Sequence, residues 1–176
     1  MKFNKVVLTG FKHCGKSLIG SLLADKTGFR LLDIDSLIVE NYFNAHGGRM
    51  GVREIYTTLG KSGFDKLEAD ALARASRSDN SVISLGGGSP INEAFSKQDF
   101  ENGIFIYLRV EPDVLFERIE KNGFPPFYDA ENPRKSFDEL FHERMPYYEK
   151  IADITVDNSN REPEEVISEI LERLES

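Results

Sequence analysis

The sequence has a single cysteine, fewer basic than acidic residues and no long hydrophobic run. The single cysteine, Cys14, cannot form a disulfide within the chain and belongs to no metal-ligand pattern. No apolar stretch approaches the roughly eighteen residues that a membrane-spanning helix requires. The apolar part of MKFNKVVLTG is too short for a secretory signal, and no cleavage site follows it. These absences predict a cytoplasmic protein that does not bind membranes.

Acidic residues outnumber basic ones by 30 to 22, which gives a formal net charge of -8. Nucleic-acid coats and membrane-surface proteins usually carry basic patches, so both classes are disfavoured. The net charge does not exclude an anionic small molecule as the ligand, because the local charge of a pocket can be opposite to that of the whole chain. The 176 residues suffice for one buried core, and no repeat or linker divides them. We expect a single domain over residues 1–176, and a monomer by default.

Apolar runs typical of strands alternate with helical patterns. The runs lie at residues 5–10, 29–35, 81–88, 103–110 and 152–157. Most are continuous, as in strands covered on both faces of a sheet. Apolar stripes at helical spacing lie at 18–23, 67–72, 114–119 and 166–174, the first of them beginning at Leu18. The alternation predicts an α/β domain with a mainly parallel sheet.

Two segments fit this alternation poorly. Residues 36–62 are predicted to form short helices and turns, and residues 121–137 a mobile loop. Insertions of this kind often carry substrates or act as lids.

The stretch from Gly10 to Ser17, GFKHCGKS, matches G-x-x-x-x-G-K-[ST] between a predicted strand and a predicted helix. Glycines let such a loop wrap closely around a phosphate, with backbone N–H groups and the positive helix end facing the anion. Lys16 would reach the β- and γ-phosphates, and the Ser17 hydroxyl would ligate Mg²⁺. A chance glycine turn is the weaker alternative, given the strand–loop–helix context. His13 is unusual in such a loop, because a positive φ is costly for a residue other than glycine.

Two further features are ambiguous when each is taken alone. Asp33 and Asp35 lie at the end of a predicted strand, where one carboxylate could support a metal and the other could face an acceptor hydroxyl. They are also typical of a helix cap and a turn. The three glycines at 86–88 permit close approach of a ligand to the backbone, or simply form a flexible loop.

The combination of motifs resembles the shikimate kinase family over nearly the whole chain. The motifs are the stretch 10–17, D-x-D at 33–35, GFDKLE at 63–68, the strand ending in GGG, and ERMPYYEKIAD at 143–153. The resemblance implies a three-layer α/β/α P-loop kinase fold with a five-stranded parallel sheet. It also implies an acceptor-binding insertion at about 36–64 and a lid at about 121–137. Family members move the γ-phosphoryl group of ATP to the 3-hydroxyl of shikimate with Mg²⁺, in aromatic amino acid biosynthesis.

The resemblance assigns roles only where residues match. Nucleotide contacts are implied for Gly10, His13, Cys14, Gly15, Lys16, Ser17, Leu18, Arg118, Arg161 and Pro163, and catalytic roles for Lys16 and Asp35. Arg118 would flank adenine, with Arg161 and Pro163 enclosing the base from the other side. Ser17 and Asp33 are implied as metal ligands. Substrate contacts are implied for Asp35, for the backbone of Gly87 and Gly88, and for Arg144, which would grip the acceptor carboxylate.

Two positions depart from the family pattern. The family's F-R-x-x-E reads FDKLE at 64–68, so Asp65 replaces an acceptor-binding arginine. The lid motif R-P-L-L reads FPPF at 124–127, so a catalytic arginine is absent from its usual place. Compensating cations could come from Arg49, Arg53, Lys61 or Lys66 near the acceptor, or from Lys121, Arg134 or Lys135 in the lid.

The departures leave several interpretations open. The chain could phosphorylate shikimate, or a different small polyol or amine-bearing acceptor whose cation pairs with Asp65. It could instead be a non-catalytic ATP-binding module, although retention of Asp35 and Arg144 argues against that. A nucleoside-monophosphate kinase is weaker still, because such enzymes need several arginines around two phosphorylated substrates and this lid is poor in arginine.

Overall fold

Five parallel strands form one sheet in the computed structural model, which describes residues 3–175. The strands are β1 (Lys5–Thr9), β2 (Arg30–Asp33), β3 (Ser81–Ser84), β4 (Gly103–Arg109) and β5 (Ile154–Asp157). They lie in the order β2-β3-β1-β4-β5, and every adjacent pair is parallel. Each predicted apolar run contains one of these strands, so the predicted parallel sheet is confirmed.

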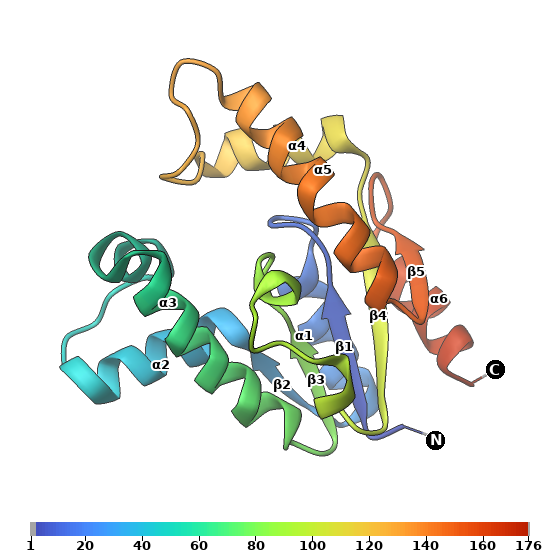
Figure 1. Ribbon diagram of the computed structural model, residues 1–176. Helices are drawn as coiled ribbons and strands as arrows, with labels where there is room; N and C mark the ends of the chain where they lie inside the picture. The colour runs from blue at the N-terminus through green and yellow to red at the C-terminus, as the bar shows by residue number, and fades with distance from the viewer. Residues whose placement is uncertain (1–2, 176) are drawn as a thin grey trace.

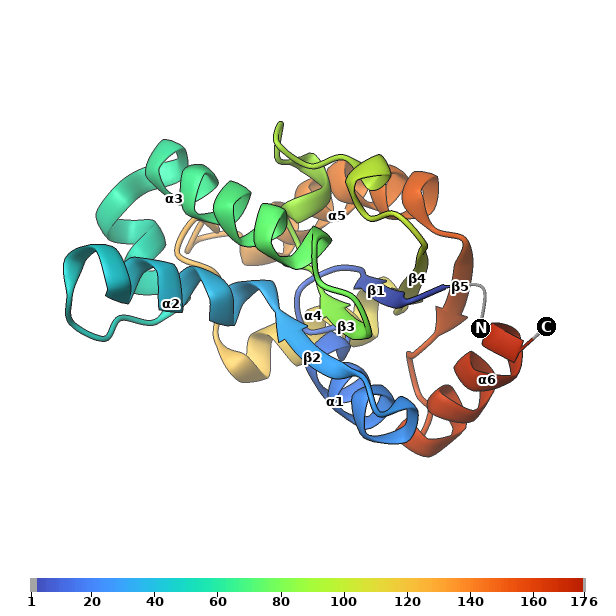
Figure 2. The ribbon, with the colours of Figure 1, turned by 90° about the horizontal axis from the view of Figure 1, so that it is seen from below.

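Helices cover both faces of the sheet. They are α1 (Lys16–Thr27), α2 (Ile34–His46), α3 (Val52–Ser76), α4 (Pro112–Asn122), α5 (Pro133–Ile151) and α6 (Pro163–Glu175), with short 3-10 turns η1 (Ser89–Ile91) and η2 (Lys97–Asp99). Figure 2 shows α1 and α6 on one side of the sheet and α3 and α5 on the other. This arrangement confirms the three-layer α/β/α fold. None of the helices in residues 3–175 combines the length and the apolar character needed to cross a membrane.

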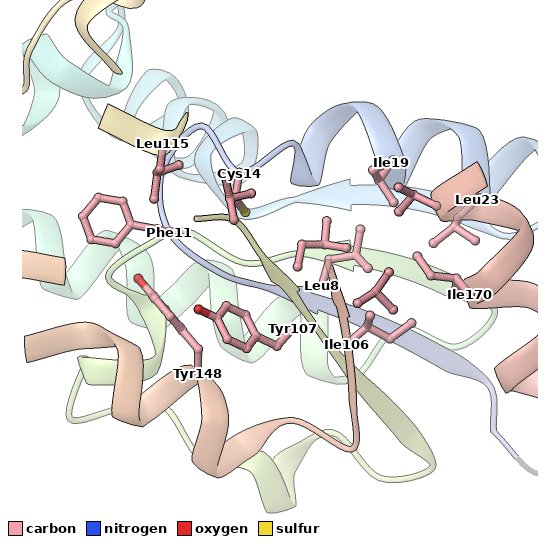
Figure 3. Packing of buried hydrophobic residues seen from close by; sticks show 14 of the residues in the cluster. Leu8, Phe11, Cys14, Ile19, Leu23, Ile106, Tyr107, Leu115, Tyr148 and Ile170 are labelled. Carbon is pink, nitrogen blue, oxygen red and sulfur yellow. The ribbon is translucent and has the colours of Figure 1, made fainter. Parts of the chain in front are cut away.

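Alternate residues of the central strand serve two separate cores. Leu8 of β1 packs into a cluster with Ile19 and Leu23 of α1 and Ile170 of α6, and Figure 3 shows these side chains facing one another. Val7, one residue earlier, belongs instead to the cluster formed with α2 and α3. Since both faces are covered, the strands carry continuous apolar runs rather than alternating ones.

The prediction for one member of the first helical stripe is wrong. Leu18 is 55% exposed, whereas Ile19 and Leu23 are buried. Helix α1 begins directly after the phosphate loop, so the first turn has one face toward the cavity described below, and Leu18 lines that cavity.

The segment predicted as short helices and turns, 36–62, belongs to two longer helices. Helix α2 begins at Ile34 and is capped by Asp33, whose Oδ1 accepts a hydrogen bond from the Ser36 N–H at 3.0 Å. Helix α3 bends at Gly60, which has φ 64° and ψ -178°, a backbone conformation that glycine adopts readily. The prediction was too fragmented because this bend and the glycines at 47, 48 and 51 resemble helix ends.

The loop predicted at 121–137 is shorter than expected. Helix α4 extends to Asn122 and α5 begins at Pro133, which leaves residues 123–132 as a loop. The side chain of Asn132 caps α5 by accepting a hydrogen bond from the Lys135 N–H at 3.2 Å, and proline is favoured at the first helical position. We call residues 123–132 the lid loop. Figure 1 shows it arching from the end of α4 to the start of α5, above the first part of α3.

Candidate functional site

A cavity of about 700 Å³ lies at the carboxyl ends of the strands β1, β2 and β3. Its walls come from the loop after β1, the start of α2, the first half of α3, the triple glycine after β3, the lid loop and α5. Ligands of open parallel sheets bind at this edge, and the volume suits a small molecule. The cavity therefore unites the phosphate motif with the insertion and the lid that the sequence predicts.

The glycines of the phosphate motif are required by close backbone packing. A Cβ atom on Gly10, which has φ 143°, would lie 2.8 Å from the Cys14 Sγ and 2.8 Å from the Leu108 carbonyl oxygen. A Cβ atom on Gly15, with φ 101°, would lie 2.5 Å from the Asn158 Nδ2. The Asn158 amide in turn donates to the Cys14 carbonyl oxygen at 2.7 Å. The loop is thus closed tightly against β4 and the segment after β5.

Lys16 lies at the centre of this loop. Its Nζ donates to the carbonyl oxygens of Gly10 and Phe11, each at 2.8 Å, and the residue is 8% exposed. Ser17 follows at the start of α1, and its Oγ donates to the Asp33 Oδ2 at 3.2 Å. The two Asp33 oxygens therefore have separate partners: Oδ1 caps α2 and Oδ2 meets Ser17. The capping and metal-side interpretations of Asp33 are compatible with one another.

The two other loop residues assigned to the nucleotide differ in orientation. His13 has φ 63°, as the sequence led us to expect, and it lines the cavity. Burial, together with the charges of Lys12, Arg53 and Lys16, lowers the pKa of His13 to about 4, so its imidazole is neutral at pH 7. The side chain of Cys14 lies in the core (Figure 3), so only its backbone could contact a nucleotide.

Asp35 faces the triple glycine from the first turn of α2. A Cβ atom on Gly86 would lie 3.4 Å from the Asp35 Oδ1 and 3.1 Å from the Glu68 Oε1. Burial, and then the charge of Asp33, raise the pKa of Asp35, while Lys12 and Lys16 oppose the rise. A carboxylate with a raised pKa in a cavity is a candidate general base.

Glu68, which the sequence analysis did not assign to the site, is 5% exposed and lines the cavity. It accepts hydrogen bonds from the Ser89 Oγ at 2.7 Å and from the Asn92 Nδ2 at 2.9 Å. Burial raises its pKa, and these two bonds oppose the rise. Glu68 therefore fixes the turn after the triple glycine to α3.

The predicted acceptor residues Gly87, Gly88 and Arg144 lie together. Cβ atoms on Gly87 and Gly88 would lie 3.6 Å and 3.7 Å from the Arg144 guanidinium, and the Tyr148 hydroxyl donates to the Gly87 carbonyl at 2.6 Å. The Arg144 guanidinium carbon is also 5.8 Å from the centre of the Phe11 ring. This end of the cavity offers a fixed cation beside glycine backbone.

The residues predicted at the adenine base lie outside the cavity lining. Arg118 donates to the carbonyl oxygens of Asn158 and Ser159, which joins α4 to the segment after β5. Arg161, in the same segment, forms an ion pair with Glu169 of α6. The structure thus brings Arg118 close to the 158–163 segment, and their contact with adenine stays a prediction.

The two positions that depart from the family pattern, Asp65 and Phe124, have different surroundings in the structure. The Asp65 Oδ2 lies 2.6 Å from the Lys61 Nζ, and both side chains line the cavity. Phe124 packs against Phe116 and Tyr128, with ring centres 5.7 Å and 6.1 Å away, whereas Phe127 lines the cavity. At Asp65 the cavity wall therefore carries an ion pair within α3. At the position of the family lid arginine, Phe124 instead packs the lid loop against α4.

Among the seven candidate compensating cations, the structure places only Arg53 and Lys61 at the cavity. Arg134 instead pairs with Asp113 and Asp138. A further cation, Lys12, was missed by the sequence analysis. It lines the cavity from within the phosphate loop, and its one signal in the sequence is a basic residue between the two glycines of the motif.

Comparisons with known proteins agree with this geometry. The family model described as shikimate kinase matches residues 12–175. A shikimate kinase from Caldanaerobacter subterraneus subsp. tengcongensis is 37% identical over 94% of this chain and 93% of its own. The crystal structure of shikimate kinase from Aquifex aeolicus has a TM-score of 0.74 at 33% identity and covers 97% of this chain and 96% of that one. A shikimate kinase from Acinetobacter baumannii, in complex with shikimate, has a TM-score of 0.84 over 98% of this chain and 93% of that one; at 22% identity this supports the fold alone.

Proposed function

The chain belongs to the shikimate kinase family, and on that premise we propose that it transfers the γ-phosphoryl group of ATP to the 3-hydroxyl of shikimate. One observation carries the proposal: a single cavity holds the phosphate-loop Lys16, the carboxylate of Asp35 and the guanidinium of Arg144. These are the groups that phosphoryl transfer to an anionic alcohol requires, namely a phosphate cation, a base and an acceptor anchor.

The proposed roles follow from the contacts. Lys16, held at the centre of the loop, would exchange its bonds to two loop carbonyls for bonds to phosphate oxygens. Arg144, beside Gly87 and Gly88, would bind the acceptor carboxylate and fix the ring against the glycine backbone. Asp35 would then accept the proton of the attacking hydroxyl.

The reaction itself is an in-line displacement at phosphorus. The acceptor oxygen forms a new bond to the γ-phosphorus, the bond from that phosphorus to the β–γ bridging oxygen breaks, and ADP leaves. The hydroxyl proton passes to Asp35, whose raised pKa makes it a stronger base than an ordinary aspartate.

The residues present fit a magnesium ion. Ser17 and Asp33 place a hydroxyl and a carboxylate oxygen 3.2 Å apart next to the phosphate loop, and oxygen ligands of this kind suit Mg²⁺. Magnesium supplies neutralisation of phosphate charge when it is bound. We propose that Ser17 and Asp33 hold it, with Asp33 kept in place by its cap of α2.

A second acceptor class is supported by one specific observation. Asp65 lines the cavity where the family motif has an arginine, so an amine-bearing acceptor could take the place of Lys61 beside this carboxylate. The pairing with Lys61 favours shikimate instead, because it neutralises the charge that would repel a carboxylate. We also propose a cytoplasmic, monomeric enzyme, in keeping with its acidic composition and single cysteine.

The test is an ADP-release assay with Mg·ATP, first with shikimate and then with small polyols and amino alcohols, with the product identified by mass spectrometry and phosphorus NMR. Shikimate 3-phosphate as the product is the expected result. No turnover of shikimate at millimolar concentration would remove the proposal, and turnover of amino alcohols alone would favour the second acceptor class. Tight ATP binding without transfer to any acceptor would identify a non-catalytic module.

A further inference from the structure

The cavity needs positive charge at the point of phosphoryl transfer. In this reaction negative charge spreads over the oxygens of the transferring group, and catalysis consists mostly of positioning and neutralising that charge. The lid loop supplies no obvious cation for this purpose. Phe124 packs against Phe116 of α4, and Arg134, at the start of α5, is paired with Asp113 and Asp138.

Five cations line the cavity: Lys12, Lys16, Arg53, Lys61 and Arg144. Lys16 belongs to the phosphate loop, and Lys61 is paired with Asp65. Arg144 lies at the acceptor end, beside the triple glycine. The remaining two, Lys12 and Arg53, form no ion pair with any residue in the described range 3–175. Lys12 and Arg53 are therefore the cavity cations that could neutralise the transferring phosphoryl group.

Lys12 belongs to the phosphate loop and lies close to the acceptor residue Gly87. Its backbone nitrogen is 3.2 Å from the position that a Cβ atom on Gly87 would occupy, and its side chain lines the cavity. Burial lowers the pKa of its ammonium group, Asp35 opposes this, and Arg53, Lys16 and Arg144 add to the lowering. The ammonium group therefore lies within electrostatic reach of both the candidate base and the phosphate-binding lysine.

Arg53 lies where the insertion meets the lid loop. Its Nη2 donates to the carbonyl oxygen of Gly123 at 2.7 Å, and Gly123 directly precedes Phe124. A second contact joins the same two segments one helical turn away, where the Tyr56 and Phe127 rings are 5.9 Å apart. Arg53 thus offers a guanidinium from α3, outside the phosphate loop, and its bond to Gly123 ties its position to the lid loop. Its charge also lowers the pKa values of Lys12 and His13, so it acts on the phosphate loop.

We propose that Lys12 and Arg53 are catalytic residues that flank the transferring phosphoryl group and neutralise its charge, with Arg53 held in place by the lid loop through Gly123. The proposal rests on the proposed kinase function and adds to it the source of the cations. Both residues come from outside the lid, so this chain reaches the same charge balance without an arginine on the lid itself.

The test uses Lys12→Met, Arg53→Met and the double variant in the full chain, with Arg49→Met as the matched control. Arg49 is an exposed arginine between α2 and α3 that does not line the cavity. Arginines that neutralise this transition state are worth about 10³-fold or more in kcat. We therefore expect kcat to fall by about 10²- to 10³-fold in each single variant. The KM for shikimate should change little, and Arg49→Met should match the wild type.

Binding of a transition-state analogue separates a catalytic role from a merely structural one. Calorimetry would compare ADP with shikimate against ADP, aluminium fluoride and shikimate. The proposal predicts that Lys12→Met and Arg53→Met weaken only the fluoride complex, and that Arg53→Lys keeps part of its affinity. If either variant raises KM for shikimate while kcat is kept, that residue binds the acceptor and the proposal is wrong for it. If Arg53→Met weakened the complexes with and without aluminium fluoride equally, Arg53 would only hold the lid loop in place and the proposal would be wrong for it.

These outcomes are distinct from failure of the proposed function. If the wild-type protein does not phosphorylate shikimate, the acceptor assignment falls. The analogue measurement with ADP and aluminium fluoride then still tests Lys12 and Arg53, because it requires no turnover. Equal affinity of the wild type and both variants for that complex would overturn the proposal.

Discussion

Replacing Asp65 with arginine should improve the binding of shikimate. Asp65 lies on α3 at the cavity wall, at the position where the family motif carries an acceptor-binding arginine. Its side chain pairs with Lys61 of the same helix, with the Lys61 Nζ 2.6 Å from the Asp65 Oδ2. An arginine here would stand at the same wall as Lys61 and could reach the acceptor carboxylate together with Arg144.

The expected gain exceeds the expected cost. A hydrogen bond to a charged group contributes about 1.5–3 kcal/mol, which corresponds to about 10- to 100-fold in affinity. The lost pair with Lys61 is exposed on the helix surface, with the lysine side chain 78% exposed, and such pairs are worth about 0.3–0.5 kcal/mol. Repulsion between Lys61 and the new arginine is of similar size. The net expectation for Asp65→Arg is a KM for shikimate about tenfold lower, with a small loss of stability.

Initial rates of ADP release against shikimate concentration measure this effect. Asp70→Arg is the control, because Asp70 is exposed on the same helix, does not line the cavity and undergoes the same change of charge. A second variant, Asp65→Asn, removes the negative charge without introducing a positive one. Its KM for shikimate should lie between those of the wild type and Asp65→Arg. An unchanged or higher KM in Asp65→Arg would refute the model in which the acceptor carboxylate faces α3.

Four further predictions concern the same cavity. Lys16→Ala should abolish turnover, because it removes the charge at the centre of the phosphate loop, and calorimetry should show weaker binding of Mg·ATP. Asp35→Asn should lower kcat by about 10²- to 10⁴-fold and leave the affinity for ATP nearly unchanged. Because burial raises the pKa of Asp35, ionisation of this carboxyl group destabilises the fold as the pH rises through the raised pKa. The Asp35→Asn variant should therefore also melt at a higher temperature than the wild type at pH 7. In the wild type, the same raised pKa should place the acid limb of kcat/KM above the ordinary value of 3.8; a limb at or below that value would exclude Asp35 as the base. Glu68→Ala should lower the free energy of unfolding by about 1–3 kcal/mol in urea titrations, because Ser89 and Asn92 lose their buried acceptor, whereas a loss below that range would show that water replaces it.

The strands were predictable because their signal is local. A strand covered on both faces must be apolar at successive positions, and Val6, Val7 and Leu8 satisfy that condition within three residues. The ends of helices were harder. The start of α5 was placed too late although Asn132 and Pro133 together form a helix start, because the polar sequence around them also suits a loop.

The site was predictable where one motif spans it. Lys16 and Ser17 were assigned from the motif and Asp33 from the family resemblance, and the structure brings all three together. The Lys61–Asp65 pair was also within reach of the sequence, because residues four apart share a helix face. The bond between Arg53 and Gly123 was not, since it joins residues 70 positions apart whose meeting depends on how the insertion and the lid loop fold.

The two missing family arginines illustrate why comparison by position misjudges such a site. Read position by position, Asp65 and Phe124 each remove a charge that the reaction uses. The cavity, however, responds to the total charge around it, and cations from other segments can supply it. Lys12 stands in the phosphate loop and Arg53 in the insertion, and both line the cavity from outside the lid loop. A catalytic contribution from a charge depends on its distance to the reacting oxygens and not on the segment that bears it. Activity of this chain would therefore follow from a relocation of charge. Such a relocation requires that Lys12→Met and Arg53→Met each lower kcat by about 10²- to 10³-fold while Arg49→Met leaves kcat unchanged.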